Sequence, residues 1–366
     1  MPWTKLVADK AGRSVSFVSD GAGGRIMSYA EAIAEAMDQA MQLDPNVIIL
    51  GQGVDRPGFV YGTTAGLSRR YGRDRVIETP IAEAAMTGVT LGASLAGLRP
   101  ILVHMRNDFL LVSMDQILNH IAHWRRLFGG SVPLVIRTII ARGWGSGAQH
   151  AQSFQRLFAG IDGLKVVMPA TPYDVKGLFL NAVAWSGPVL FFEHRWLYSD
   201  KGYVPEKPYI VPLGKAAIRS EGKDLTVVAM SFANRDVASA LADLGDEGIT
   251  ADWIDLRSVN PLDMDTIYRS VYKTGRLLIV ENGPVNCGVG AEVAARAAED
   301  CWDYLRAPIL RIGWPGTTIP AGCKLEESFY PGPDDLRKAI IKLVKQNDSR
   351  EAYPRRAQIS LASRQG

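Results

Sequence analysis

The sequence predicts an α/β protein with two doubly wound domains. Two observations support this fold class: short apolar segments alternate with amphipathic ones twice along the 366 residues, and a polar stretch with several prolines separates the two series. Strands that alternate with helices at this spacing form a parallel sheet with helices on both faces. A chain of this length also exceeds one ordinary domain, so two domains are expected.

The first series of elements is assigned to a domain at 26–200. Apolar residues recur at helical spacing from Tyr29 to Met41, which predicts the first helix. The glycine-rich residues 51–75 are expected to form a loop. The other predicted elements are strands at 47–51, 76–78, 100–104, 133–137, 164–169 and 188–192, and helices that begin at Glu83 and span 113–127 and 173–185.

The remaining segments complete the predicted organisation. Residues 1–25 show no periodicity and are expected to be an extended N-terminal arm, and the proline-punctuated residues 201–223 are expected to be a linker. A second domain is assigned to 224–345, and the polar, basic residues 346–366 to a flexible tail. The second domain's predicted elements are strands at 226–230, 251–255, 277–281 and 308–312, and helices at 234–244, 288–298 and 334–345.

Composition excludes several classes of protein. Apolar residues make up 47% and charged residues 22%, as in soluble globular proteins. The chain has 41 basic and 38 acidic residues without a basic stripe, so no nucleic-acid interface is expected. No apolar run is long enough for a membrane span and no secretory signal is present, so a cytoplasmic location is expected. Cys287, Cys301 and Cys323 form no CxxC pair, so neither disulfides nor a zinc site is predicted.

Glu83 is the most informative residue in the sequence. It heads a helix rich in alanine and glycine, which is expected to be buried. Burying a carboxylate costs several kcal/mol or raises its pKa, so Glu83 should have a partner there. The alternative is a carboxylate at a helix start that offsets the macrodipole and stays in water. The local sequence does not decide between the two.

A glycine-rich loop that ends at His150 is the second strong feature. Gly143, Gly145 and Gly147 alternate after a buried strand. Glycine permits positive φ and close approach of the backbone to a ligand. A histidine at the carboxyl end of such a strand lies where open α/β sheets bind ligands. The alternative is a structural turn with a surface histidine.

Other motifs are absent or incomplete. His120 and His123 share a helix but have no third ligand at a suitable spacing, so a metal site is not predicted. Gly288 and Gly290 open a helix without the full GxGxxG pattern, which excludes a Rossmann dehydrogenase. No GxSxG elbow and no Walker A loop is present.

Several motifs together resemble one family in register. The chain is similar, from about residue 26 to residue 343, to the beta subunit of the thiamine-diphosphate-dependent first component of 2-oxo acid dehydrogenases, the pyruvate and branched-chain type of the transketolase-like superfamily. The motifs are ETPIAE at 78–83, GLRP at 97–100, DQILN at 115–119, QHAQ at 149–152, DLRSVNPLD at 255–263 and CGVGAE at 287–292. Each is weak alone, and their common order makes the resemblance specific.

This resemblance implies a pyrimidine-binding domain followed by a transketolase C-terminal domain. It also implies that Glu83 hydrogen-bonds a ring nitrogen of the cofactor's aminopyrimidine and shares a proton with it. Phe109 falls where the family stacks an aromatic ring on the pyrimidine, and Ile81 where an apolar residue lines it. His150 falls on an active-site histidine that contacts the substrate carboxylate and faces the lipoyl arm. The implied reaction is decarboxylation of a 2-oxo acid and transfer of the acyl unit to a lipoyl carrier.

A missing motif implies a partner. The family's diphosphate site is a Gly-Asp-Gly run followed by an asparagine, which together hold a magnesium ion, and this chain has no such run. The resemblance therefore implies that a separate alpha subunit supplies the diphosphate and metal ligands, in a heterotetramer of two alpha and two beta subunits. A lipoyl acyltransferase core is a further expected partner, and no metal ligand is expected in this chain.

Three departures from the family pattern leave the substrate open. A polar run at 106–108 stands where apolar residues are usual, and Ala151 replaces the commoner serine. Trp185 and Gly187 occupy positions where the family often has an aspartate and an asparagine that bind a monovalent cation, which puts such a site in doubt.

Two alternatives to the dehydrogenase interpretation follow. The first is a split transketolase-type or carboligase subunit that transfers a two-carbon or acyl unit to a non-lipoyl acceptor. The second is a non-catalytic scaffold that docks onto an acyltransferase core. The presence of Glu83, Phe109 and His150 argues against the scaffold, which has no need of a buried carboxylate.

Overall fold

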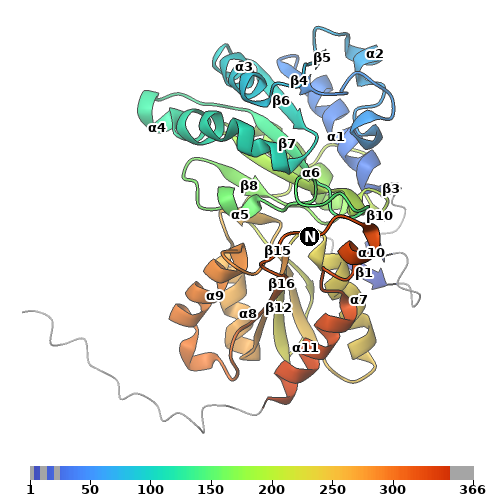
Figure 1. The fold of residues 1–366 in the computed structure, drawn as a ribbon, viewed down its shortest axis with the longest axis vertical. Helices are drawn as coiled ribbons and strands as arrows, with labels where there is room; N and C mark the ends of the chain where they lie inside the picture. Colours follow the sequence, from blue (N-terminus) through green and yellow to red (C-terminus); the bar gives the residue numbers. More distant parts are fainter. Residues whose placement is uncertain (1–3, 9–14, 20–24, 347–366) are drawn as a thin grey trace, which may run out of the picture.

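The computed structural model describes residues 4–8, 15–19 and 25–346, and it confirms the predicted fold class. Two α/β domains follow one another along the long axis of the molecule, the first in blue to green and the second in yellow to red (Figure 1). Each domain has a mostly parallel sheet with helices on both faces. None of the helices within these ranges is long and apolar enough to cross a bilayer.

The first domain is built on a seven-stranded sheet in the order β14-β8-β9-β7-β6-β4-β5. All neighbours pair in parallel except β14, which comes from the second half of the chain and pairs antiparallel with β8. The sequence analysis did not predict β14. The strands are β4 (Val47–Gly51), β5 (Val76–Glu78), β6 (Arg99–His104), β7 (Val135–Ile140), β8 (Lys165–Val167), β9 (Val189–His194) and β14 (Ser258–Asn260).

Helices cover both faces of this sheet, which explains why its strands are continuously apolar. On one face α1 (Tyr29–Leu43) and α6 (Pro172–Ala184) pack against each other and against alternate strand residues such as Ile49. The other face carries α3 (Glu83–Leu95) and α5 (Gln155–Phe158), which share a core with Ile48 and Leu50.

Two predicted segments of the first domain differ in the structure. The segment 113–127 is not one amphipathic helix. It consists of the end of the 3-10 helix η2 (Asn107–Ser113), the π-helical η3 (Gln116–Ala122) and the short α4 (Trp124–Phe128). Ile117 and Ile121 are nevertheless both buried, because side chains four positions apart lie on nearly the same face of a π turn. The segment 51–75 is a loop that also contains η1 (Phe59–Gly62) and α2 (Leu67–Tyr71).

The second domain has a five-stranded sheet in the order β11-β13-β12-β15-β16, in which only β11 is antiparallel. On one face α7 packs against α11, and on the other α8 packs against α9. The helices α8 and α10 were not predicted. The elements are β11 (Ala217–Ser220), β12 (Leu225–Ala229), α7 (Ala233–Gly245), β13 (Ala251–Asp255), α8 (Met264–Thr274), β15 (Leu277–Pro284), α9 (Val289–Asp300), β16 (Leu310–Trp314), α10 (Cys323–Glu327) and α11 (Pro333–Lys345).

The predicted arm and linker contain strands. A four-stranded sheet has the order β1-β2-β10-β3, so the described parts of residues 1–25 are not free of regular structure. Its strands are β1 (Thr4–Ala8), β2 (Val15–Ser19), β3 (Ile26–Ser28) and β10 (Lys201–Tyr203). The linker prediction at 201–223 was also wrong for β10 and β11. Strands this short carry little local signal, and their pairing partners lie far away in the sequence. The predicted tail, beyond residue 346, lies outside the described residues.

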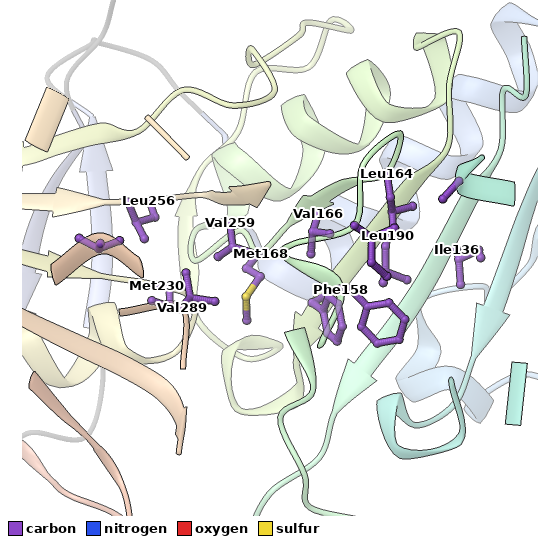
Figure 2. Packing of buried hydrophobic residues seen from close by; sticks show 14 of the residues in the cluster. Ile136, Phe158, Leu164, Val166, Met168, Leu190, Met230, Leu256, Val259 and Val289 are labelled. Carbon is purple, nitrogen blue, oxygen red and sulfur yellow. The ribbon is translucent and has the colours of Figure 1, made fainter. Parts of the chain in front are cut away.

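The two domains are joined by a continuous core and by buried ion pairs. Figure 2 shows Met230, Leu256, Val259 and Val289 of the second half beside Met168 of the first, within one cluster of buried residues.

Ion pairs cross the same boundary. The Asp174 carboxylate of α6 pairs with Arg219 and, at 3.0 Å, with Arg257, and Arg219 also pairs with Asp255 at 2.6 Å. Burial raises the pKa of Asp174, but the two guanidinium charges outweigh that effect and hold it below its usual value. The second domain is therefore fixed against the first.

A buried ion pair inside the first sheet gives a test of this fold. Arg137 of β7 and Glu193 of β9 are both fully buried, and Thr63 and Tyr198 complete their hydrogen bonds. The variant Arg137→Met should lower the free energy of unfolding by about 3–5 kcal/mol, because it leaves Glu193 as an unpaired buried charge. Urea unfolding followed by circular dichroism measures this.

The exposed pair between Arg337 and Glu247 supplies the control, since its side chains are 43% and 41% exposed. The variant Arg337→Met should leave the urea midpoint nearly unchanged. Equal effects of the two variants would contradict the role of burial.

Candidate active site

The predicted site residues gather at the carboxyl edge of the seven-stranded sheet. Glu83 begins α3 shortly after β5, Phe109 lies in η2 after β6, and His150 lies in the loop after β7. The strands β5, β4, β6 and β7 are successive neighbours, so their carboxyl ends open onto one edge. Ligands bind at this edge in open α/β sheets.

Glu83 lies at the open start of α3, where Ala82 provides no side-chain cap. Glu83 lines a hollow of about 10 Å³, which is about the room for one water molecule and is also lined by Gln52, Thr79 and His104. Burial lowers the pKa of His104 to about 4, so this ring is neutral near pH 7. Its Nε2 lies 3.4 Å from Thr87 Oγ1.

The expected burial of the Glu83 helix is only half right. Thr87, Thr90 and Leu91 of α3 are buried, and Glu83 itself is half-buried. The opposite face of the helix is exposed and consists of Ala85, Gly88, Val89 and Gly92. In the single chain the Glu83 carboxyl group is therefore not in a dry pocket. The expected burial of this carboxylate would require another molecule to cover the exposed face of α3.

Phe109 and His150 are brought together although 41 positions separate them in the sequence. Their ring centroids are 5.4 Å apart with an interplanar angle of 81°, an edge-to-face contact. The Phe109 ring is partly buried and His150 is exposed. The helix α3, which carries Glu83, packs against the η2 segment that carries Phe109.

Two polar residues that the sequence analysis did not assign hold the segment after His150. Asn107 is fully buried, its Nδ2 donates to the Gln152 carbonyl at 2.8 Å, and its Oδ1 accepts from the Phe154 N–H at 2.9 Å. The carboxyl group of Asp108 accepts from the Gln152 N–H at 3.0 Å. The sequence could have indicated this, because the polar run at 106–108 directly follows a buried strand, and polar side chains that are buried need hydrogen-bond partners.

The glycine-rich loop before His150 packs closely against other parts of the chain, including the second domain. Gly143, Gly145 and Gly147 have φ of 92°, 68° and 68°. A Cβ atom at Gly143 would lie 2.8 Å from the Trp196 ring, and one at Gly145 would lie 2.9 Å from the Gly322 backbone nitrogen. Of the two interpretations that the sequence left open, these contacts favour the structural turn, because protein packing requires glycine at these positions.

A carboxylate from the second domain fixes this loop. Glu326 of α10 is buried and accepts from the N–H groups of Gly143 at 2.5 Å and Gly145 at 2.7 Å. The Tyr330 hydroxyl donates to the same carboxylate at 2.8 Å. Sequence patterns near Glu326 gave no signal for this role, since its partners lie about 180 residues earlier.

The residues present suit the pyrimidine half of a thiamine cofactor. Glu83 offers a carboxyl group and Phe109 a partly exposed ring, while Ile81, just before α3, is an apolar side chain that is 80% exposed. These groups can bind a flat heteroaromatic ring by hydrogen bonding and stacking. In the described ranges no three His, Cys, Asp or Glu residues are grouped as a metal site would require.

Trp185, which stands at the position where the family often binds a monovalent cation, packs against a lysine side chain. The Lys165 ammonium group lies 4.5 Å from the centroid of the Trp185 ring, and burial lowers the pKa of Lys165.

Comparisons with known proteins point to one family. The sequence matches the families "Transketolase, pyrimidine binding domain" over residues 25–201 and "Transketolase, C-terminal domain" over residues 214–336. The acetoin:2,6-dichlorophenolindophenol oxidoreductase subunit beta of Bacillus subtilis (strain 168) is 41% identical over 334 residues, which are 87% of this chain and 98% of the relative. The 2-oxoisovalerate dehydrogenase subunit beta of the same organism is 39% identical over 323 residues, which are 87% and 99% of the two chains.

A third relative and a solved structure extend the comparison. The pyruvate dehydrogenase E1 component subunit beta of Gracilaria tenuistipitata var. liui is 39% identical over 316 residues, with 86% of this chain and 98% of the relative covered. A structure titled "Split gene transketolase, inactive beta4 tetramer" has a TM-score of 0.71 at 24% identity and covers 88% of this chain and 99% of its own, which is a likeness of fold. The resemblance found in the sequence is confirmed: the chain belongs to the family of E1 beta subunits of thiamine-dependent 2-oxo acid dehydrogenases.

Proposed function

We propose that this chain provides the cofactor-activating half of an active site that decarboxylates a 2-oxo acid and passes the acyl unit to a lipoyl carrier. One observation carries the proposal: Glu83, Phe109 and His150 converge at the carboxyl edge of the first sheet, next to an exposed face of α3. A half-buried carboxyl group beside an uncovered apolar face is what one side of a shared site requires.

Each residue has a separate role in this proposal. Glu83 shares a proton with a ring nitrogen of the aminopyrimidine, and Phe109 and Ile81 hold the ring in place. His150 binds the substrate carboxylate and stands where the lipoyl arm enters. Bound thiamine diphosphate supplies the electron sink that decarboxylation needs.

The rest of the site is assigned to a partner. An alpha subunit holds the diphosphate and Mg²⁺, in a heterotetramer of two alpha and two beta subunits. The names of the relatives, which call each a subunit beta, support this assignment, as does the lack of a Gly-Asp-Gly run in this chain. A lipoyl acyltransferase core is a further proposed partner. The pyrimidine-binding domain is proposed at 26–200 and the C-terminal domain at 224–345, and the family matches over residues 25–201 and 214–336 support a division into these two domains. A cytoplasmic location stays a prediction.

A second candidate reaction is cleavage of a neutral acyloin. It is favoured by the names of two relatives, the acetoin oxidoreductase beta subunits of Bacillus subtilis and Cupriavidus necator, which are 41% and 40% identical to this chain. The same residues would serve, because only the group that leaves the carbonyl carbon differs.

Calorimetry with thiamine diphosphate tests the shared site. We expect no tight binding by this chain alone with Mg²⁺, and tight binding once the co-encoded alpha subunit is added, because the diphosphate ligands come from the partner. Tight binding by the isolated chain would overturn the division of the site between two subunits.

The variant Glu83→Gln tests the proton transfer. We expect turnover in the assembled enzyme to fall by about 100- to 10,000-fold, because an amide cannot exchange the proton. Folding, by circular dichroism, and assembly, by gel filtration, should be unchanged. Glu292→Gln is the matched control, since Glu292 is an exposed glutamate in the first turn of another helix, α9. Retained turnover in Glu83→Gln would remove Glu83 from the mechanism.

The variant His150→Ala separates decarboxylation from acyl transfer. We expect reductive acylation of a lipoyl domain to lose more activity than decarboxylation assayed with an artificial electron acceptor, because His150 stands where the arm enters. His120→Ala, on the exposed surface of η3, is the control. Unchanged reductive acylation in His150→Ala would exclude the histidine from the site.

A further inference from the structure

A cavity of about 470 Å³ at the boundary of the two domains takes no part in the proposed reaction. Trp144 and Trp196 of the first domain line it, together with Phe232 and Tyr330 of the second. The helices α7 and α10, which supply part of the lining, lie at this boundary (Figure 1). Cavities of about 300–1,000 Å³ that are lined mainly by apolar and aromatic side chains are the usual sites for small organic ligands.

Arg142 brings unused hydrogen-bond donors to this cavity. Its Cζ lies 4.4 Å from the centroid of the Phe232 ring and 4.4 Å from that of the Tyr330 ring, so two cation–π contacts hold the guanidinium group. Burial lowers the pKa of Arg142, and the charges of Asp236 and Glu326 act in the opposite direction, so its charge is not uncompensated. Within the described ranges, however, its side chain donates no hydrogen bond. The free fork of N–H groups suits a carboxylate, which can accept two parallel hydrogen bonds.

Asp236 of α7 brings an unused carboxyl group to the same cavity. It is partly buried, and among the residues that the structure describes it has neither a hydrogen bond nor an ion pair. Its neighbour Arg235 pairs with Asp200 at 3.2 Å instead. Glu326, by contrast, is already engaged by three hydrogen bonds. Arg142 and Asp236 are therefore two opposite charges that line one cavity without pairing with each other.

The charges of the lining favour a ligand that carries both signs. Burial raises the pKa of Asp236 to about 6, against the charges of Arg142 and Arg235, so its carboxyl group is mainly ionised at pH 7. A purely anionic ligand would meet the carboxylates of Asp236, Glu326 and Glu327, and a purely cationic one would meet Arg142. A zwitterion can place its carboxylate at the guanidinium group and its ammonium group at the unpaired carboxylate, so that both charges are compensated.

We propose that this cavity binds an α-amino acid with an aromatic side chain, whose carboxylate pairs with Arg142 and whose ammonium group pairs with Asp236. The aromatic ring of the ligand packs against Trp144 and Trp196, whose ring centroids are 5.6 Å apart and which are 59% and 39% exposed. The site is separate from the proposed reaction, because neither Glu83 nor His150 belongs to the lining of this cavity.

The ligand would also link the two domains. Arg142 belongs to the first domain and Asp236 to the second, so a molecule held by both adds a contact across the boundary. Gly143 and Glu326, whose hydrogen bond crosses the same boundary, line the cavity as well. Because a ligand that binds only the folded state stabilises it, the melting temperature of the full-length chain should rise with ligand concentration.

Calorimetry on the full-length chain at pH 7 tests the site with three matched compounds. L-phenylalanine carries both charges, phenylpropanoate lacks the ammonium group and phenylethylamine lacks the carboxylate. We expect saturable binding of L-phenylalanine, and binding of each of the other two that is about 10- to 100-fold weaker. Each truncated compound loses one hydrogen bond between charged groups, which accounts for a difference of this size.

Two variants assign the two charges. Asp236→Asn should remove the advantage of L-phenylalanine over phenylpropanoate, and Arg142→Gln should remove its advantage over phenylethylamine. Asp243→Asn is the control, since Asp243 is an exposed aspartate of the same helix, and it should change neither ratio. If Arg142→Gln does not fold, Asp236→Asn decides alone, because the amide has nearly the shape of the carboxyl group that it replaces.

Three outcomes would overturn the site. The first is no saturable binding of L-phenylalanine up to about 10 mM. The second is equal affinity for all three compounds, which would indicate unspecific apolar binding. The third is an equal loss for all three compounds in Asp236→Asn, which would indicate a general disturbance of the cavity. None of these outcomes bears on the proposed reaction, which Glu83→Gln tests separately.

Discussion

The interaction on which the site depends most is the pair of hydrogen bonds from the Gly143 and Gly145 N–H groups to the Glu326 carboxylate. The loop has a backbone in the left-handed region at Gly143, Gly145 and Gly147 and also at Trp144, where φ is 66°. Left-handed backbone at a non-glycine residue is unfavourable and persists only where its surroundings enforce it. Here the second domain enforces it, because Glu326, Gly322 and Ala321 all belong to that domain. The packing of the second domain against the first therefore also holds the loop that leads to His150.

The far end of the same segment is held from within the first domain. Asn107 and Asp108 bind the backbone of Gln152 and Phe154, just beyond His150. The backbone on both sides of His150 is therefore held by hydrogen bonds, at residues 143–145 and at residues 152–154. Within the polar run at 106–108, which departs from the family pattern, Asn107 and Asp108 therefore have a physical role: they fix the loop. Phe109 then follows in the 3-10 helix η2, and its ring meets that of His150 edge to face.

The sequence predicted the features that local patterns encode. Buried strands such as 47–51 and the helix start at Glu83 follow from apolar periodicity, and the structure agrees with them. The glycines at 143–147 were recognised, but the choice between a ligand-binding loop and a structural turn stayed open, because their contact with Gly322 cannot be read from either segment alone. The strand β14 was missed for the same reason, since three residues give no signal without their partner β8. The exposed face of α3 was predicted to be buried because an apolar helix looks the same whether its own chain or another subunit covers it.

Substrate choice within the family is likewise not decided by the features that its members share. Relatives of nearly equal identity are named for acetoin, 2-oxoisovalerate and pyruvate. A neutral acyloin and an anionic oxo acid thus serve enzymes whose beta subunits share this fold and length. In the proposed site, the carboxyl group of Glu83 and the ring of Phe109 act on the cofactor, so these two side chains do not distinguish the substrates by charge. Selection between the two kinds of substrate must therefore come from other side chains around the site.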